Sequence, residues 1–352
     1  MQMKFMAVVA LGALVAACGG GADKSGGQAA GGRAIRVVGS STVYPFTTAV
    51  AEQFVRKNPN FAPPIVESTG TGAGMKLFCA GVGSQHPDIE NASRRMKASE
   101  AELCQKNGVK TIVEIKVGVD GLAFAAAKES PLTGLTTEDL YKALAANPYG
   151  KPQTAKTWKD VNPALPAIAI NVYGPPPTSG TRDSLNELVL EAGCKKNPEM
   201  KALKESDEDK FKELCTKIRE DGAFVEAGEN DNLIVQKIEA NPNSVGAFGY
   251  SFLEENTDKV KGLAINGVVP TAATITDFSY PASRPLFIYV KGEHVNVVPG
   301  LKEFVAEYTR ETTFGPEGYL VRRGLVASPT AEREQMRAIA EGMTPLDVSA
   351  LK

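Results

Sequence analysis

The chain has 352 residues, of which 43% are apolar and 23% are charged, and its formal net charge is −2. This composition is typical of a globular protein, and the length is sufficient for two lobes. Because nucleic-acid binding needs a basic surface, the charge excludes that class of partner.

The N-terminal residues indicate export. Lys4 precedes an apolar run at 5–17, which is shorter than the roughly 20 residues that span a bilayer. The run matches the hydrophobic region of a secretory signal peptide, so we assign residues 1–17 to such a signal. It ends in VAAC at 15–18, which resembles the cleavage and acylation box of bacterial lipoproteins. That resemblance implies lipidation of Cys18, whereas the alternative is an ordinary signal peptide with an incidental cysteine.

Residues 18–33 are rich in Gly, Ala and Ser and contain hardly any large apolar side chain. A segment of this composition cannot bury enough surface to fold and is typical of a flexible tether. We therefore expect a protein on the periplasmic or cell-envelope side, held to the inner or outer membrane by its lipid. In such lipoproteins an Asp after the cysteine favours the inner membrane, and Gly19 lacks that signal.

Beyond the tether, short β-branched runs alternate with amphipathic helical stretches, which predicts an α/β fold. Strands are expected at 34–39, 65–68, 112–115, 117–126, 168–173, 245–250 and 286–290. Helices are expected at 43–57, 74–80, 137–146, 182–192, 200–220, 233–240, 301–309 and 331–342.

Three loops along this pattern share one design. They are 39–42 (GSST), 68–74 (STGTGAG) and 177–181 (PTSGT), and each follows a predicted strand and opens a predicted helix. Hydroxyls and unpaired backbone N–H groups therefore gather at helix N-termini, where oxyanions such as phosphate bind. A single loop of this kind is often only a helix cap, but three in one exported chain predict convergence on one tetrahedral oxyanion.

Four cysteines remain besides Cys18, an even number in an exported chain, which predicts two disulfide bonds. Three pairings are open from the sequence, and we favour the neighbour pairing because it closes two short loops. A zinc site is the competing interpretation, but no CxxC or Cys/His cluster is present, so we expect no metal and no cofactor. The residues concerned are Cys79, Cys104, Cys194 and Cys215, with His86 and His294 expected at the surface.

The sequence resembles the phosphate-binding proteins of bacterial phosphate ABC transporters. The resemblance is carried in order by GSSTVYP at 39–45, STGTGAGMK at 68–76, NASRRM at 91–96, SGTR at 179–182 and AFGYSF at 247–252. It implies a two-lobed type II periplasmic-binding-protein fold with a ligand cleft between the lobes. Lobe one is then expected at 34–120 plus 285–352, and lobe two at 121–284.

The resemblance also implies a set of phosphate ligands. Lobe one would contribute the Ser41 and Thr42 hydroxyls, the Val43 backbone and the Thr71 hydroxyl, and lobe two would contribute Ser179, Gly180 and Thr181. The lobes would close around the dehydrated anion, and the expected protein is a monomer that delivers phosphate to the membrane permease of the transporter.

Two departures from the family pattern affect selectivity. Well-known members have an Asp where this chain has Arg94, and that Asp accepts the proton of phosphate and so rejects sulfate. Those members also have an Arg and an Asp just ahead of SGT, where this chain has Pro175 to Pro177. This chain resembles the subgroup with Ser-Arg and SGT-Arg motifs, in which Arg94 and Arg182 would supply positive charge to the anion. The alternative for each arginine is a salt bridge elsewhere. Candidates for the missing proton acceptor are Asp183, Glu67 and Asp231.

Two other classes of function compete with phosphate binding. A hydrolase using Ser179 or Ser41 would need a base to activate the hydroxyl, and with two histidines and no GxSxG motif we expect no enzyme. A binding protein of the same fold for another oxyanion or a phosphorylated headgroup is the main alternative to phosphate.

Overall fold

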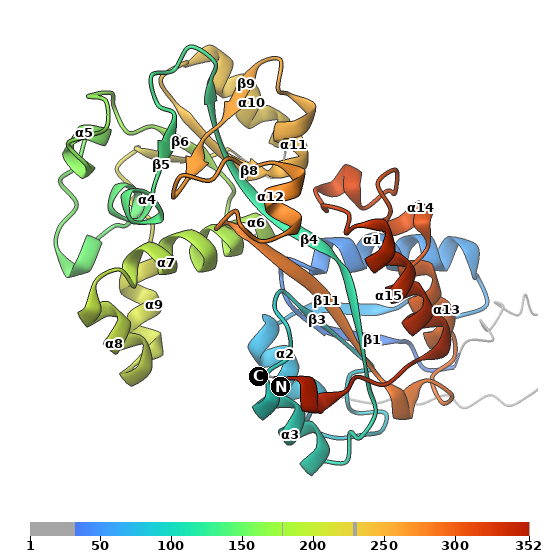
Figure 1. Ribbon diagram of the computed structural model, residues 1–352. Helices are drawn as coiled ribbons and strands as arrows, with labels where there is room; N and C mark the ends of the chain where they lie inside the picture. Colours follow the sequence, from blue (N-terminus) through green and yellow to red (C-terminus); the bar gives the residue numbers. More distant parts are fainter. Residues whose placement is uncertain (1–31, 178, 228–230, 352) are drawn as a thin grey trace, which may run out of the picture.

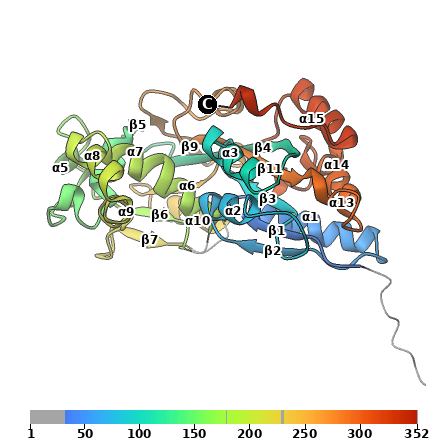
Figure 2. The same ribbon diagram turned by 90° about the horizontal axis from the view of Figure 1, so that it is seen from below.

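The computed structural model describes residues 32–177, 179–227 and 231–351, with the side chains of residues 231 and 232 excepted. The predicted signal peptide, Cys18 and nearly all of the predicted tether lie outside these residues. Figures 1 and 2 show two bodies side by side, which we call lobe one and lobe two, joined by the strands β4 and β11. None of the helices in the described ranges has the length and apolar character that a membrane crossing needs.

A mixed sheet of nine strands runs through both lobes in the order β2-β1-β3-β11-β4-β8-β6-β7, with β9 also paired to β4. In lobe one β1 is parallel to β2 and β3, whereas β11 is antiparallel to both β3 and β4. A separate pair, β5 and β10, lies in lobe two. The strands are β1 (Arg36–Gly39), β2 (Ile65–Ser68), β3 (Ile89–Ala92), β4 (Ile112–Ala127), β5 (Gly134–Leu135), β6 (Val172–Gly174), β7 (Phe224–Glu226), β8 (Val245–Gly249), β9 (Val260–Gly262), β10 (Ala264–Ile265) and β11 (Ser283–Lys291).

Helices cover both faces of the sheet in lobe one. On one face lie α1 (Tyr44–Lys57), α13 (Leu301–Tyr308), α14 (Glu311–Phe314) and α15 (Thr330–Gly342), and on the other α2 (Thr71–Phe78) and α3 (Ala98–Lys106). The helices of lobe two are α4 (Thr137–Leu144), α5 (Trp158–Val161), α6 (Gly180–Ser184), the π-helical turn η2 (Leu185–Leu190), α7 (Glu191–Cys194), α8 (Pro198–Ser206), α9 (Glu208–Thr216), α10 (Asp231–Ala240), α11 (Tyr250–Glu255) and α12 (Ala272–Thr276). Short 3₁₀ turns occur at η1 (Pro148–Gly150), η3 (Gly292–His294), η4 (Val321–Arg323) and η5 (Val348–Ala350).

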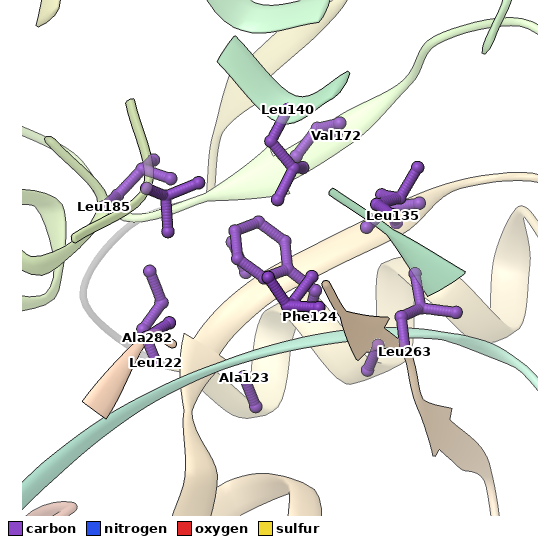
Figure 3. Packing of buried hydrophobic residues seen from close by; sticks show 14 of the residues in the cluster. Leu122, Ala123, Phe124, Leu135, Leu140, Val172, Leu185, Leu263 and Ala282 are labelled. Carbon is purple, nitrogen blue, oxygen red and sulfur yellow. The ribbon is translucent and has the colours of Figure 1, made fainter. Parts of the chain in front are cut away.

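The buried apolar side chains divide into clusters that follow the lobes. One cluster draws its buried members from 119–282 together with Val326, and Figure 3 shows its Phe124 ring surrounded by Leu140, Val172 and Leu185. Two further clusters draw theirs from 35–117 and 286–340. This division supports our proposed boundaries, with lobe one at 34–120 plus 285–352 and lobe two at 121–284.

The expected elements are present, and three of them differ clearly in extent. The strands expected at 112–115 and 117–126 form one strand, β4, because β11 pairs with it on both sides of Lys116. Further along, β4 pairs with β8 of lobe two. The helix expected at 200–220 is two helices, because Asp207 ends α8 and caps α9 by accepting a bond from the Lys210 N–H. The strand expected at 168–173 is β6 and begins only at Val172.

The structure contains the disulfide bonds Cys79–Cys104 and Cys194–Cys215, so the favoured neighbour pairing is confirmed. The expected surface position of His294 is wrong, since this side chain is buried. Its Nδ1 bonds Asp88, and its Nε2 accepts the Gly83 N–H at 2.9 Å. Burial lowers the pKa of His294 despite the bond to Asp88, and the nearby Lys291 lowers it further.

Candidate functional site

The loop after β1 is shaped by a backbone that only glycine adopts without strain. Gly39 has φ +128°, and a Cβ on it would lie 2.2 Å from the Asn91 carbonyl oxygen. The next residue, Ser40, donates its N–H to the same oxygen at 2.7 Å. The chain then enters α1 at Tyr44, with Pro45 in the first turn, where its missing N–H costs nothing. Ser41, Thr42 and Val43 are thereby placed at the N-terminus of a 14-residue helix.

The second loop is bound to the first through the backbone. The N–H groups of Thr69 and Gly70 both donate to the Gly39 carbonyl oxygen at 2.8 Å. Gly70 has φ +78°, after which α2 begins at Thr71. The Thr71 hydroxyl lies 3.1 Å from the Ser93 hydroxyl and accepts the Ser93 N–H at 3.1 Å. Because β1, β2 and β3 are parallel, their carboxyl ends bring these loops to one edge of the sheet.

A buried carboxyl group lies beneath these two loops. Glu90 in β3 is fully buried, and neither carboxyl oxygen has a hydrogen-bond partner among the described residues. A Cβ on Gly39 or on Gly74 would lie 2.9 Å from its Oε1. Burial raises the pKa of Glu90 well above its usual range, Glu100 raises it further, and Arg94 acts in the opposite direction. The folded protein therefore favours an uncharged Glu90.

The third loop belongs to lobe two and meets the first loop directly. Ser179 caps α6 by accepting the Thr181 N–H at 3.2 Å. Gly180 approaches lobe one so closely that a Cβ on it would lie 2.6 Å from the Thr42 Cα. The Thr42 hydroxyl donates to the Gly180 carbonyl oxygen at 3.2 Å, and the Ser41 hydroxyl donates to the Asp183 carboxylate. The structure thus brings the Ser41 and Thr42 hydroxyls and the SGT helix together between the lobes, whereas the Thr71 hydroxyl bonds Ser93 within lobe one.

Sequence reasoning missed a group of buried polar residues beside this contact. Arg284, in β11, donates from Nη2 to the Thr42 hydroxyl at 2.6 Å and to the Ser184 hydroxyl at 2.7 Å. Its Nε donates to Asp120 of β4 at 3.3 Å, and its Nη1 donates to Glu187. No local signal marks Arg284, which lies between Ser283 and Pro285, just outside the strand predicted at 286–290.

The two arginines predicted to contact the anion are paired elsewhere. Arg94 donates to both oxygens of Glu100, at 2.9 and 2.7 Å, and this bond raises the pKa of the Arg94 guanidinium. Arg182 is buried, lies 4.8 Å from the centre of the Phe224 ring and bonds Glu226 at 2.7 Å. It lines a hollow of about 590 Å³ with the chain at 217–226. Among the described residues, neither guanidinium bonds Ser41 or Thr42, whereas Arg284 bonds Thr42.

The three candidate proton acceptors differ in position. Asp183 touches the Ser41 hydroxyl at the contact between the lobes. Glu67 lies in β2 with an exposed side chain, and the side chain of Asp231 lies outside the described residues. In the described part of the chain, no group of three His, Cys, Asp or Glu side chains could hold a metal ion.

The comparisons with known proteins agree with this architecture. Residues 24–312 match the model of the PBP superfamily domain. Protein SphX of Synechococcus elongatus is 34% identical over 293 residues, which cover 79% of this chain and 76% of that protein. The phosphate-binding protein PstS of Staphylococcus aureus is 33% identical over 311 residues, covering 86% and 83%. A crystal structure of a possible phosphate binding protein from Planctomyces limnophilus has a TM-score of 0.71 and 28% identity, covering 89% of this chain and 99% of that one.

The fold and the meeting of helix N-termini between two lobes define a binding protein of the PBP superfamily, and the predicted α/β periplasmic-binding-protein fold is confirmed. Within that superfamily, the chain belongs to the family of the PstS and SphX proteins, the substrate-binding components of phosphate ABC transporters.

Proposed function

We propose that this protein binds inorganic phosphate outside the cytoplasm and delivers it to the permease of a phosphate ABC importer. The observation that carries the proposal is the contact between the lobes, where Ser41 and Thr42 face the SGT loop across a distance of one hydrogen bond. The relatives named as phosphate-binding proteins at 33% identity support the choice of anion. The family is one of transport proteins, and we expect no catalysis.

In this proposal phosphate enters between the two loops as the lobes separate and is held when they close. Ser41, Thr42 and the Val43 N–H would bond it from lobe one, and Ser179, Gly180 and Thr181 from lobe two. Both sets lie at helix N-termini, where unpaired N–H groups and the helix dipole favour an anion. The Thr71 hydroxyl would join from the second loop.

Arg94 and Arg182 are the proposed source of further positive charge. Each would exchange part of its present salt bridge for phosphate oxygens, and the partners Glu100 and Glu226 have side chains that are 18% and 50% exposed. Arg182 has the more exposed partner, so its exchange with an anion costs less than that of Arg94. A guanidinium can bind two oxygens of one phosphate at once.

We also propose that the protein is exported and anchored to a membrane. Export by the signal peptide at 1–17, lipidation of Cys18 and the tether at 18–33 would hold the two lobes at the membrane surface beside the permease. The two disulfide bonds support an oxidising compartment.

The test is calorimetry on purified residues 33–352, refolded to remove bound anion and titrated with phosphate and with sulfate at neutral pH. Micromolar or tighter phosphate binding with no sulfate binding supports the proposal. Equal binding of both anions means a general oxyanion site. Binding of neither contradicts the proposal and favours a larger phosphorylated ligand.

A further inference from the structure

Arg284 is a buried cation at the place where both lobes and both crossing strands, β4 and β11, meet. Its side chain is 6% exposed. It bonds Thr42 from lobe one, Ser184 and Glu187 from lobe two, and Asp120 from β4. A buried guanidinium must keep its donors bonded, because leaving the charge uncompensated is strongly unfavourable.

The two carboxylates that bond Arg284 differ in their access to water. Asp120 has a side chain that is 12% exposed and lies in β4, directly opposite Arg284 of β11 in the antiparallel pairing. Glu187 has a side chain that is 54% exposed and lies in the π-helical turn η2 that follows the SGT helix. π-helical turns occur frequently at functional sites. Asp120 therefore cannot leave Arg284 without losing a buried partner, whereas Glu187 can turn into solvent at little cost.

The position of Glu187 is equivalent to that of an anionic ligand. A carboxylate and a phosphate present the same pair of oxygens to a guanidinium. The Nη2 atom of the same guanidinium lies 2.6 Å from the Thr42 hydroxyl, one of the proposed phosphate ligands. An anion bonded to Thr42 therefore lies within reach of Arg284 and competes with Glu187 for it.

We propose that Arg284 is a specificity-determining cation of the phosphate site and that Glu187 is a competing carboxylate, displaced when phosphate binds and returned when phosphate leaves. This inference rests on the proposed function. Asp120 keeps Arg284 in place during the exchange. The permanent charge of Arg284 makes the site selective for anions, and the return of Glu187 aids release at the permease.

The experiment measures phosphate affinity by calorimetry in the refolded wild-type protein and in Glu187→Gln. Removing the competing charge is expected to tighten phosphate binding by about two- to fivefold, the range that an exposed ion pair permits. The matched control is Asp221→Asn, which alters a carboxylate 53% exposed against a buried arginine, Arg219, 5% exposed. That variant is expected to bind phosphate as the wild type does.

A double-mutant cycle with Arg284→Lys tests whether the gain passes through Arg284. Lysine keeps the charge but presents one ammonium group in place of the planar fork, so phosphate binding is expected to weaken about tenfold or more. In the Arg284→Lys background, Glu187→Gln is expected no longer to tighten phosphate binding. A loss of structure alone would not remove the effect of Glu187→Gln in this way. If Arg284→Lys does not fold, the phosphate affinities of Glu187→Gln and of its control, Asp221→Asn, are sufficient to test the exchange.

The outcomes separate this inference from the proposed function. A wild-type protein that binds no phosphate overturns both. A wild-type protein that binds phosphate, with Glu187→Gln unchanged or weaker, overturns the exchange alone. So does an Arg284→Lys variant with wild-type affinity.

Discussion

The contact between Ser41 and Asp183 concerns the chemistry that separates phosphate from sulfate. At neutral pH phosphate carries a proton and sulfate does not, so a carboxylate in the site accepts a bond from the first and repels the second. The Asp183 carboxylate already accepts the Ser41 hydroxyl across the lobes. Of the three candidate acceptors, it is the one that the structure places at the proposed phosphate ligands.

Asp183→Asn is therefore expected to reduce selectivity. Loss of a hydrogen bond to a charged group costs about 1.5–3 kcal/mol, so the Kd for phosphate should rise about 10- to 100-fold. Sulfate should bind more tightly than in the wild type, because the repelling charge is gone. Calorimetric titration with both anions measures the change. A variant that keeps the wild-type ratio of the two affinities shows that another group accepts the proton.

Glu90 provides a second prediction, on stability rather than binding. Burial raises the pKa of Glu90 in the folded protein, so the unfolded chain releases this proton at a lower pH than the folded one. The contribution of protonated Glu90 to the stability of the folded protein is fully present below the pKa of Glu90 in the unfolded chain. It is lost as the pH rises through the pKa of Glu90 in the folded protein. Glu90→Gln cannot ionise. The free energy of unfolding of this variant, minus that of the wild type, should therefore increase with pH, by at most about 1.4 kcal/mol per pH unit.

Urea denaturation of both proteins between about pH 5 and pH 8 measures this difference. The relevant quantity is the change in the gap between the two stabilities, since a constant gap reflects packing alone. A gap that does not change with pH means that Glu90 has an ordinary pKa in the folded protein.

At the scale of elements, the sequence pattern predicts which helices and strands exist better than it predicts where they begin and end. The apolar spacing over 200–220 is helical throughout, and nothing in that spacing marks Asp207 as a break. The break arises because the α8 and α9 helices pack back on each other, and Asp207 supplies the cap that the turn needs. Likewise, β4 is continuous because β11 pairs along it from Ile112 to Gly121, and this pairing is a tertiary feature.

The candidate site likewise contains residues that the sequence predicts and residues that it does not. The three loops could be predicted because glycine and hydroxyl residues at a strand–helix junction have a local physical meaning. Arg284 and Glu187 could not, since they lie 97 positions apart and Arg284 is positioned by the register of β11 on β4. That register changes between Leu286 and Phe287, close to Arg284, and no local pattern reports it.

The Cys194–Cys215 disulfide joins α7 to α9, and both cysteines are fully buried in the core of lobe two. Replacing both by serine removes a cross-link that closes a loop with a sequence separation of 21. We expect the free energy of unfolding of lobe two to fall by about 3 kcal/mol, measured by urea denaturation under non-reducing conditions. The matched variant, Cys79→Ser with Cys104→Ser, removes a loop of separation 25 in lobe one.

If the lobes unfold in separate transitions, each pair of substitutions should shift only the transition of its own lobe. Wild-type stability in both variants would show that the cross-links contribute nothing beyond the packing around them.

At the scale of the whole molecule, the site exists only where the lobes meet. Lobe one contributes the loop of Ser41 and Thr42, lobe two contributes the SGT loop, and the strands β4 and β11 run between them. Any anion bound by both loops must therefore hold the lobes together. The distance of closest approach is set by Gly180, whose backbone lies against Thr42.

Gly180→Ala tests this arrangement. The added Cβ would lie 2.6 Å from the Thr42 Cα and 3.0 Å from the Ser41 carbonyl oxygen, both of them backbone atoms of the opposite lobe, which cannot rotate away. Overpacking of this kind costs about 1–3 kcal/mol, so the Kd for phosphate should rise about 5- to 100-fold. Stability against urea without phosphate should change little, because the clash disappears when the lobes separate.

The matched control is Gly342→Ala at the end of α15, where the added Cβ meets only the Thr344 hydroxyl, at 3.1 Å. This variant should bind phosphate normally. Small-angle scattering with saturating phosphate should give a larger radius of gyration for Gly180→Ala than for the wild type or the control, since the lobes can no longer approach fully. Wild-type affinity and compactness in Gly180→Ala would mean that phosphate is bound with the lobes further apart, and that the contact between Gly180 and Thr42 is not part of the bound state.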